Sequence, residues 1–281
     1  MASPQSIPGP SSPRPHSLRS VDSTSSSPLE LSSATLALLG QFQEQKAEET
    51  ERFRRLEEQA ERRRREAQGA TLAPRDGEGE NEVKPVGEAQ RMSVDEFRRD
   101  FGESWQLSQF WYSASFSSHL ASLVHAQLSS SDATLAFISC PTAYVGFQHA
   151  YDRGNTYLLE YDTRFALLSE QEFVRYDLDE PLALPEGLKG KVDFMVVDPP
   201  FLNEATCRKV AQSVQALLAP HGRMLLLTGR SVSDTAKRVY KEVAGVQLRD
   251  TQLSVEHAGG LANDFGAWAS WQGAEEWGTR Q

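Results

Sequence analysis

Apolar positions follow different spacings in successive parts of the chain. Up to Pro28 few side chains are apolar. Between Leu36 and Leu56 apolar side chains recur at helical spacing, and from there to Gln68 nearly every residue is charged or polar. From Val94 onward, short apolar runs alternate with helical patterns. These spacings predict a tail without a core, then one long helix, and then a folded domain.

Four regions follow from this pattern. Ser and Pro dominate residues 1–30, which we expect to be disordered because they bury too little apolar surface to offset their ordering entropy. Residues 31–68 are expected to form a charged helix with a solvated face, the alternative being a basic contact surface at residues 62–65. Gly, Pro, Glu and Asp dominate residues 69–93, which read as a flexible linker. The folded domain is expected to occupy residues 94–281.

Strands and helices alternate along the folded domain. Ser93 and Glu96 predict a capping box at the start of its first helix. The expected strands span residues 134–139, 156–161, 172–176, 192–197, 223–228, 246–248 and 265–271. The expected helices between them span residues 113–128, 143–151, 203–218 and 233–243. This order indicates βαβ units and a parallel sheet, and the last two strands indicate an antiparallel hairpin at one edge.

Acidic residues follow two of the expected strands. An open α/β sheet binds its ligands outside the carboxyl ends of the strands. The second strand ends in Glu160, with Asp162 close behind, and an acidic residue here accepts hydrogen bonds from ribose in nucleoside-binding folds. Asp177, after the third strand, lies where a carboxylate could meet an adenine amino group. Each of them could also be an ordinary charged residue at a strand end.

The fourth expected strand ends in the sequence DPPF, residues 198–201. Neither proline has an N–H group, so the sheet ladder cannot continue through them. A rigid strand-to-helix turn is one explanation, because proline suits the first position of a helix. A substrate-binding motif is the other, since the position at a strand end is where such a fold carries its chemistry.

Charge and composition narrow the class of partner. The 281 residues carry a formal net charge of −10, and residues 101–281 contain 14 Lys and Arg against 21 Asp and Glu. An acidic surface favours basic partners and weakens the case for DNA or RNA. No run approaches the ~20 apolar residues of a membrane span, so we expect a soluble protein. Cys140 and Cys207 are too few for a disulfide framework and are expected to be buried thiols, and no Cys/His cluster has the spacing of metal ligands.

Several segments resemble one family of methyltransferases. DPPF resembles the signature of amino-directed methyltransferases that use S-adenosylmethionine. Together with SWQLSQFWYS, LEYDTRFA, FVRYDLDEPLALPE and LANDFGAW, it resembles the N6-adenine methyltransferase-like proteins that act as lysine methyltransferases of translation elongation factor 1-alpha. The match runs from about Phe101 to Trp271. It implies an α/β fold with the seven-stranded Rossmann-like sheet of class I methyltransferases, and S-adenosylmethionine as cofactor.

The resemblance also implies roles for residues. The Asp198 carboxylate and the Pro199 carbonyl would accept two hydrogen bonds from an amine and aim its lone pair at the methyl donor, with Pro200 holding the backbone. Phe201 would line the lysine channel, since its ring face attracts a cation. The expected cofactor-binding residues are Gln109, Phe110, Trp111, Ser139, Glu160, Asp162 and Asp177. Trp111 could equally be a core aromatic, and the loop SCPTAYVGF, which contains Ser139, lacks the usual Gly-x-Gly.

Three functions remain open from the sequence. The resemblance favours a monomeric, cytoplasmic protein-lysine N-methyltransferase of elongation factor 1-alpha that binds neither nucleic acid stably, nor a membrane, nor a metal. The first alternative is an N6-adenine methyltransferase acting on DNA or RNA, in which Phe201 stacks on a flipped base. The second is a binding protein without catalysis, which an intact DPPF sequence argues against.

Overall fold

The computed structural model describes residues 91–259 and 264–279, together with helical positions between residues 35 and 65. Those positions are 35–36, 39–41, 43–44, 47–48, 50–51, 54–58, 61–62 and 65. The expected tail at residues 1–30 and the linker residues 69–90 lie outside the described residues.

In the described part of residues 31–68, oppositely charged side chains form ion pairs at helical spacing. Arg54 contacts Glu51 at 2.7 Å and Glu58 at 2.5 Å. All three side chains are exposed. Such pairs stabilise an isolated helix only slightly, and they are typical of a solvated face.

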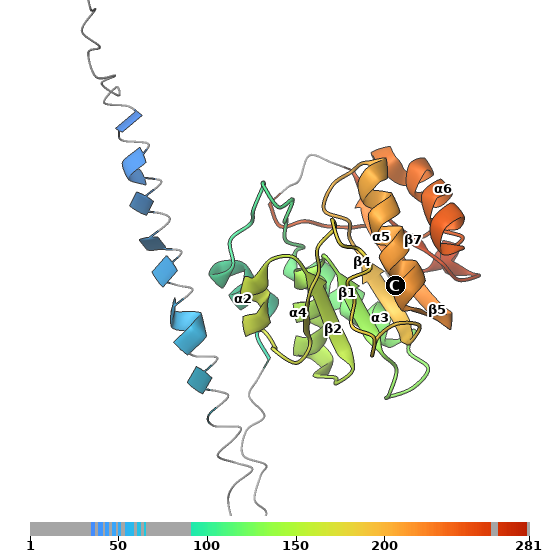
Figure 1. The fold of residues 1–281 in the computed structure, drawn as a ribbon, viewed down its shortest axis with the longest axis horizontal. Coiled ribbons are helices and arrows are strands. Elements are labelled where there is room, and N and C mark those ends of the chain that lie inside the picture. The colour runs from blue at the N-terminus through green and yellow to red at the C-terminus, as the bar shows by residue number, and fades with distance from the viewer. Residues whose placement is uncertain are drawn as a thin grey trace, which may run out of the picture. The chain divides into compact units, whose positions relative to one another are not determined.

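A seven-stranded sheet forms the centre of the folded domain, with the order β3-β2-β1-β4-β5-β7-β6 (Figure 1). The strands are β1 (Leu135–Ile138), β2 (Thr156–Glu160), β3 (Phe173–Arg175), β4 (Val192–Val197), β5 (Leu218–Gly229), β6 (Arg249–Asp250) and β7 (Phe265–Ala269). Strands β1 to β5 pair in parallel, and β7 pairs antiparallel with both β5 and β6. The predicted parallel sheet and the antiparallel hairpin at its edge are confirmed.

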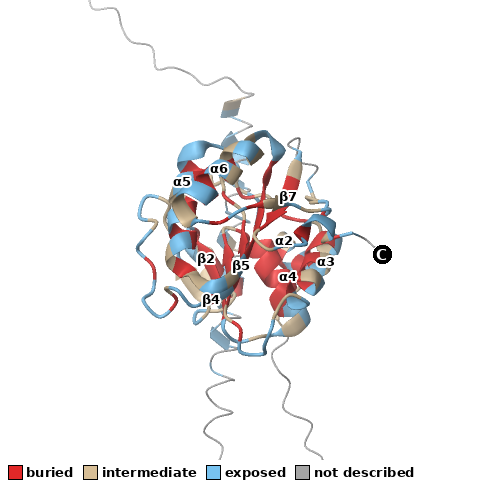
Figure 2. Cartoon of the chain, turned by 90° about the vertical axis from the view of Figure 1, so that its right-hand side faces the viewer, coloured by how far each residue is buried: buried red, intermediate tan, exposed pale blue. Residues whose placement is uncertain are grey.

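The helices cover both faces of the sheet. They are α2 (Val94–Asp100), α3 (Ala114–His125), α4 (Pro141–Tyr151), α5 (Glu204–Leu217) and α6 (Ser233–Ala244). Side chains of α2, α3 and α4 share one buried cluster, and those of α5 and α6 share a second one. Figure 2 shows the buried residues running through the sheet between these helices. Ser93 and Glu96 form the predicted capping box of α2.

Strand β4 shows why consecutive residues of a strand in this sheet, here residues 194–197, are all apolar. Phe194 and Val196 belong to the cluster of α2, α3 and α4, whereas Met195 and Val197 belong to that of α5 and α6. Successive side chains of a strand point to opposite faces, and here both faces are covered. The strand therefore carries its carboxyl end, and the DPPF sequence after it, on a fully packed support.

Several boundaries differ from the sequence-based expectation by two residues or more. Strand β5 begins at Leu218 and not at residue 223, α3 ends at His125 and not at residue 128, and β7 ends at Ala269 and not at residue 271. Strand β6 pairs with β7 at Arg249–Asp250 and not at residues 246–248. The side chains of Val246 and Leu248 are buried in the core, which explains why this segment has an apolar pattern without pairing in the sheet. Helix α4 begins at Pro141, two residues earlier than expected, since proline suits the first turn of a helix. Both predicted thiols are buried and free, as expected.

Candidate active site

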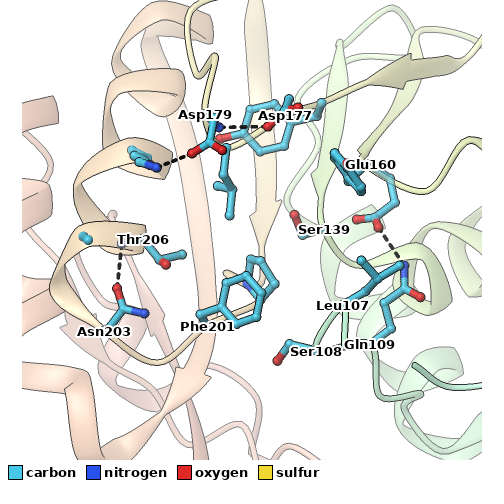
Figure 3. A pocket seen from close by; sticks show the side chains of 16 residues that line it. Leu107, Ser108, Gln109, Ser139, Glu160, Asp177, Asp179, Phe201, Asn203 and Thr206 are labelled. Atoms are coloured by element: carbon cyan, nitrogen blue, oxygen red, sulfur yellow. Dashed lines mark hydrogen bonds and ion pairs between the residues drawn. The ribbon is translucent and has the colours of Figure 1, made fainter. Parts of the chain in front are cut away.

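A cavity of about 470 Å³ opens at the carboxyl ends of β1, β2 and β3 and the amino end of α5 (Figure 3). We call it the large cavity, and its walls include Gln109, Ser139, Glu160, Asp177 and Phe201. The sheet order reverses between β1 and β4, so the cavity lies at the switch point where open α/β sheets bind ligands. Four of the seven predicted cofactor-binding residues are brought together here.

Glu160 and Gln109 form a buried pair in the wall of the large cavity. Gln109 Nε2 donates a hydrogen bond to Glu160 Oε1 at 2.9 Å, and burial raises the pKa of Glu160 to about 7 (Figure 3). Gln109 Oε1 is also buried and has no hydrogen-bond partner among the residues that the structure describes. Buried polar atoms are normally paired, so this orphan acceptor and its neighbouring carboxylate are suited to hydroxyl donors such as those of a ribose.

Asp177 lines the large cavity beyond the end of β3. Its Oδ1 accepts a hydrogen bond from the backbone N–H of Asp179 at 2.9 Å. Asp179 in turn pairs with Lys209 of α5 at 2.6 Å, which links two walls of the cavity. The Asp177 carboxylate is thereby held at a fixed place in the wall, where it can accept from an amino group.

Ser139 takes the place of a glycine at the turn from β1 to α4. Its φ angle is 55°, in the left-handed region, and its N–H donates to the Leu159 carbonyl at 2.9 Å. Non-glycine residues adopt this conformation at a cost of about 1–2 kcal/mol. The chain thus makes a tight turn beside the cavity with serine, without the Gly-x-Gly sequence.

Asp198 lies one residue beyond β4, with its N–H donating to the Ile138 carbonyl at 3.0 Å. The hydroxyl of Tyr112 donates a hydrogen bond to Asp198 Oδ2. Burial raises the pKa of Asp198 to about 7, the Tyr112 hydrogen bond opposes this shift, and the charge of Glu160 adds to it. The sequence reasoning missed Tyr112, although it directly follows the predicted segment Gln109 to Trp111.

A second, narrow cavity of about 30 Å³ lies on the other side of the DPPF sequence. Its walls are formed by Ser108, Phe110, Asp198, Pro199, Pro200, Leu202, His257 and Phe265. Ser108 and Pro200 also line the large cavity, so the two cavities share a wall. Asp198 and Pro199 therefore face a slim compartment with aromatic sides, next to a larger polar one.

His257 contributes an uncharged wall to the narrow cavity. Its ring centroid lies 5.0 Å from that of Tyr112 and 4.7 Å from that of Phe265. Burial lowers the pKa of His257 to about 4, so the imidazole is neutral near pH 7. A cation that enters the cavity consequently meets aromatic faces and a carboxylate, and no like charge on this side.

Four predicted residues have a different place from the one expected. Trp111 is buried between Phe97 and Phe165, and its Nε1 donates to the Phe101 carbonyl at 2.8 Å, so it is a core aromatic. Asp162 does not line the large cavity, because its carboxylate pairs with Arg164 at 2.7 Å.

The other two are aromatic residues of the cavity walls. Phe110 lines the narrow cavity and not the large one, where we expected it to cover the cofactor. Phe201 lines the large cavity and is 43% exposed, whereas the resemblance had placed it in the lysine channel. In both cases the direction of the side chain, which the sequence does not specify, decides which cavity the residue reaches.

In the described part of the chain, no three His, Cys, Asp or Glu side chains gather where they could hold a metal ion. Each helix there is too short or too polar to cross a lipid bilayer.

Residues 103–273 match the model of a protein family described as "Probable N6-adenine methyltransferase". The chain belongs to this family. This match confirms the resemblance that the sequence segments indicated, and with it the class I methyltransferase fold, the enzyme class and S-adenosylmethionine as the cofactor. The large cavity, with its orphan acceptor and its carboxylates, fits the ribose and adenine of that cofactor.

Three relatives of the chain are named as lysine methyltransferases. The chain is 33% identical over 199 residues to the protein-lysine N-methyltransferase EFM5 of Saccharomyces cerevisiae, covering 65% of this chain and 78% of that one. It is 38% identical over 178 residues to the protein-lysine N-methyltransferase M142.8 of Caenorhabditis elegans, covering 60% and 79%. It is 35% identical over 165 residues to the EEF1A lysine methyltransferase 1 of Homo sapiens, covering 58% and 72%.

Replacing Glu160 with glutamine should weaken binding of S-adenosylmethionine by about 1–3 kcal/mol, because a hydrogen bond to a charged acceptor is lost. Ribose hydroxyls favour the ionised carboxylate, so the affinity of the unaltered protein should rise as the pH increases through about 7, the pKa of Glu160. The variant should lose this pH dependence. Calorimetric titration between pH 5.5 and 8.5 measures both effects.

The neighbouring carboxylate provides the control for this experiment. Asp162→Asn should leave the dissociation constant unchanged within about twofold, because Asp162 lies outside the large cavity. A loss of affinity in Asp162→Asn but not in Glu160→Gln would move the ribose contact to Asp162.

Proposed function

We propose that this protein transfers a methyl group from S-adenosylmethionine to the side-chain amine of a lysine in translation elongation factor 1-alpha. The observation that carries this proposal is the narrow cavity, where Asp198 and Pro199 meet the aromatic side chains of Phe110 and Phe265. The names of the relatives from yeast, nematode and human support a lysine as the acceptor.

The size of the narrow cavity favours a lysine over a nucleobase. A volume of about 30 Å³ has room for only a few water molecules. An unbranched alkyl chain with a terminal amine needs little widening to enter, whereas a flipped adenine would need the walls to move apart. The aromatic side chains of Phe110 and Phe265 in its wall also suit an ammonium group, because aromatic rings attract cations.

The side chains of the narrow cavity can prepare the amine for attack. A free lysine has a pKa near ~10.4 and must lose a proton before its nitrogen is nucleophilic. Transfer into a desolvated, partly aromatic cavity lowers that pKa. Asp198 and the Pro199 carbonyl are acceptors that can orient the two remaining N–H groups, and Asp198 can take the proton. When bound, S-adenosylmethionine supplies the electrophilic methyl group.

A second candidate is an N6-adenine methyltransferase that acts on DNA or RNA. The description of the family and the half-exposed ring of Phe201 beside the large cavity favour it. The formal net charge of −10 and the small volume of the narrow cavity count against it. With the first candidate we also propose a cytoplasmic monomer that recognises a protein and does not bind nucleic acid stably.

Transfer of a labelled methyl group decides between the two candidates. The purified protein and labelled S-adenosylmethionine are offered elongation factor 1-alpha, duplex DNA and RNA in separate reactions. We expect label on the elongation factor, and its loss when the lysine amines of that factor are blocked beforehand. Label on nucleic acid alone would overturn the lysine assignment while leaving the methyltransferase assignment intact.

A further inference from the structure

Tyr112 is held rigidly at the back of the narrow cavity. Its backbone lies in a short antiparallel pairing with residues 256–258, in which Ser113 N–H donates to the Glu256 carbonyl at 2.9 Å. The ring is 1% exposed, and its centroid lies 5.0 Å from that of Phe116. Its hydroxyl therefore has a fixed position, from which it donates a hydrogen bond to Asp198 Oδ2.

The hydrogen bond from Tyr112 makes the two oxygens of the Asp198 carboxylate unequal. Within residues 91–259 and 264–279, Tyr112 is the side chain that donates to this carboxylate, and it donates to Oδ2. A hydrogen bond to one oxygen fixes the plane of the carboxylate and leaves Oδ1 as an acceptor. Asp198 also lines the narrow cavity, so the free acceptor and the amine site belong to the same compartment.

We propose that Tyr112 is a positioning residue for the amine acceptor: its hydroxyl orients Asp198 so that Oδ1 receives the substrate N–H, and it keeps Asp198 in the carboxylate form. The inference deepens the proposed function and rests on it for the identity of the amine. Tyr112 does not itself contact the amine in this arrangement.

The charges around Asp198 explain why it needs such a donor. The titratable side chains that act on Asp198, or that it acts on, are Tyr112, Cys140, Glu160 and Tyr240. His257 lines the narrow cavity together with Asp198. Burial raises the pKa of Cys140 and both tyrosines and lowers that of His257, so these four side chains are neutral near pH 7. Glu160, whose own pKa is about 7, is left as the neighbour that becomes charged in this range, and its charge favours protonation of Asp198. The Tyr112 hydroxyl opposes both Glu160 and burial.

Removing this hydroxyl should shift the pH dependence of enzyme activity to higher pH. Asp198 is a strong acceptor for an N–H, and can take a proton, only while it is ionised, that is, above its pKa. Without the hydrogen bond from Tyr112 that pKa rises by about one to two units, the equivalent of a hydrogen bond to a charged group. Tyr112→Phe should therefore lose about 10- to 100-fold in kcat/KM well below pH 7 and about 5- to 50-fold at pH 7, and most of this loss should disappear above pH 9.

Tyr144→Phe is a matched control. The Tyr144 hydroxyl also donates to a carboxylate, Glu172 Oε2, at 2.5 Å, and Tyr144 is likewise buried. It lines neither of the two cavities. We expect the pH profile of kcat/KM for Tyr144→Phe to coincide with that of the unaltered protein, even if its stability falls by the amount typical of a lost hydrogen bond.

A second measurement reports the protonation state of Asp198 without any substrate. The chain is labelled with carbon-13 at its aspartate carboxyl carbons, and the Asp198 resonance is identified by its absence in Asp198→Asn. Its midpoint should lie near pH 7 in the unaltered protein and about one to two units higher in Tyr112→Phe, but not in Tyr144→Phe. Because Glu160 titrates in the same range, the same titration repeated in Glu160→Gln separates the two carboxylates.

The outcomes distinguish this inference from the proposed function. An unchanged midpoint in Tyr112→Phe, or a loss of activity that is equal at every pH, would overturn the role of Tyr112. If the unaltered protein does not methylate elongation factor 1-alpha, the proposed substrate is wrong, and the carbon-13 titration still decides whether Tyr112 controls Asp198. A midpoint below pH 5 in the unaltered protein would also contradict the inference.

Discussion

Asp198→Ala should reduce methyl transfer by about 10²- to 10⁴-fold, the range expected when a general base or an orienting acceptor is removed. The substitution leaves the large cavity untouched, because Asp198 lines the narrow one. The dissociation constant of S-adenosylmethionine should therefore change by less than about threefold. Transfer of labelled methyl groups measures the first effect, and calorimetric titration measures the second.

A second aspartate on the same strand serves as the control for this prediction. Asp193 is exposed near the other end of β4, where its Oδ2 accepts a hydrogen bond from Thr134 N–H at 2.8 Å. Asp193→Ala also removes a carboxylate with a hydrogen bond, but far along the strand from the DPPF sequence, and it should leave turnover unchanged. Turnover within tenfold of normal in Asp198→Ala would show that the acceptor lies elsewhere, and the Pro199 carbonyl would then be the remaining candidate.

Trp111→Ala should lower the free energy of unfolding by about 3–5 kcal/mol, the usual loss for a large buried aromatic. Trp111 is 3% exposed, packs with Phe97 and Phe165, and donates its indole N–H to the Phe101 carbonyl at 2.8 Å. Its removal leaves both a cavity and an unpaired carbonyl. Chemical denaturation, followed by the circular dichroism of the backbone, measures the change in the free energy of unfolding.

The matched variant is Trp105→Ala, in the same segment of the chain. Trp105 is 79% exposed and touches Phe110 at a ring distance of 4.8 Å. Substitution of an exposed side chain usually changes stability by less than about 0.5 kcal/mol. If Trp111→Ala left stability intact and weakened cofactor binding instead, Trp111 would be a cofactor residue after all, as the resemblance first implied.

The sequence by itself determined most of the secondary structure and the place of the chemistry. Strand β4 was predicted with its exact bounds, Val192–Val197, because a strand buried on both faces is apolar at nearly every position, a pattern that is visible locally. The capping box of Ser93 and Glu96 was predictable for the same reason, since its partners are three residues apart. The positions of Glu160, Asp177 and Asp198 at strand ends follow from the rule that open sheets bind ligands there.

The tertiary structure decided which residues face one another. The hydrogen bond from Tyr112 to Asp198 joins residues 86 positions apart, and no local pattern encodes such a contact. His257 reaches the narrow cavity through a short pairing of its segment with that of Tyr112, which the strand pattern does not reveal. The insertion of β7 between β5 and β6 likewise depends on pairing between distant segments.

The directions of neighbouring side chains are the clearest example of what the sequence alone does not determine. Gln109, Phe110 and Trp111 are consecutive, yet they reach the large cavity, the narrow cavity and the core respectively. The sequence identified the segment as part of the site but assigned all three to one ligand. Successive side chains of an extended segment point in different directions, and what each of them meets depends on elements that fold against the segment from elsewhere. The residue types of the site and their places at strand ends were thus predictable from local patterns. The acceptor geometry and the raised pKa of Asp198 arise only from burial and long-range contacts.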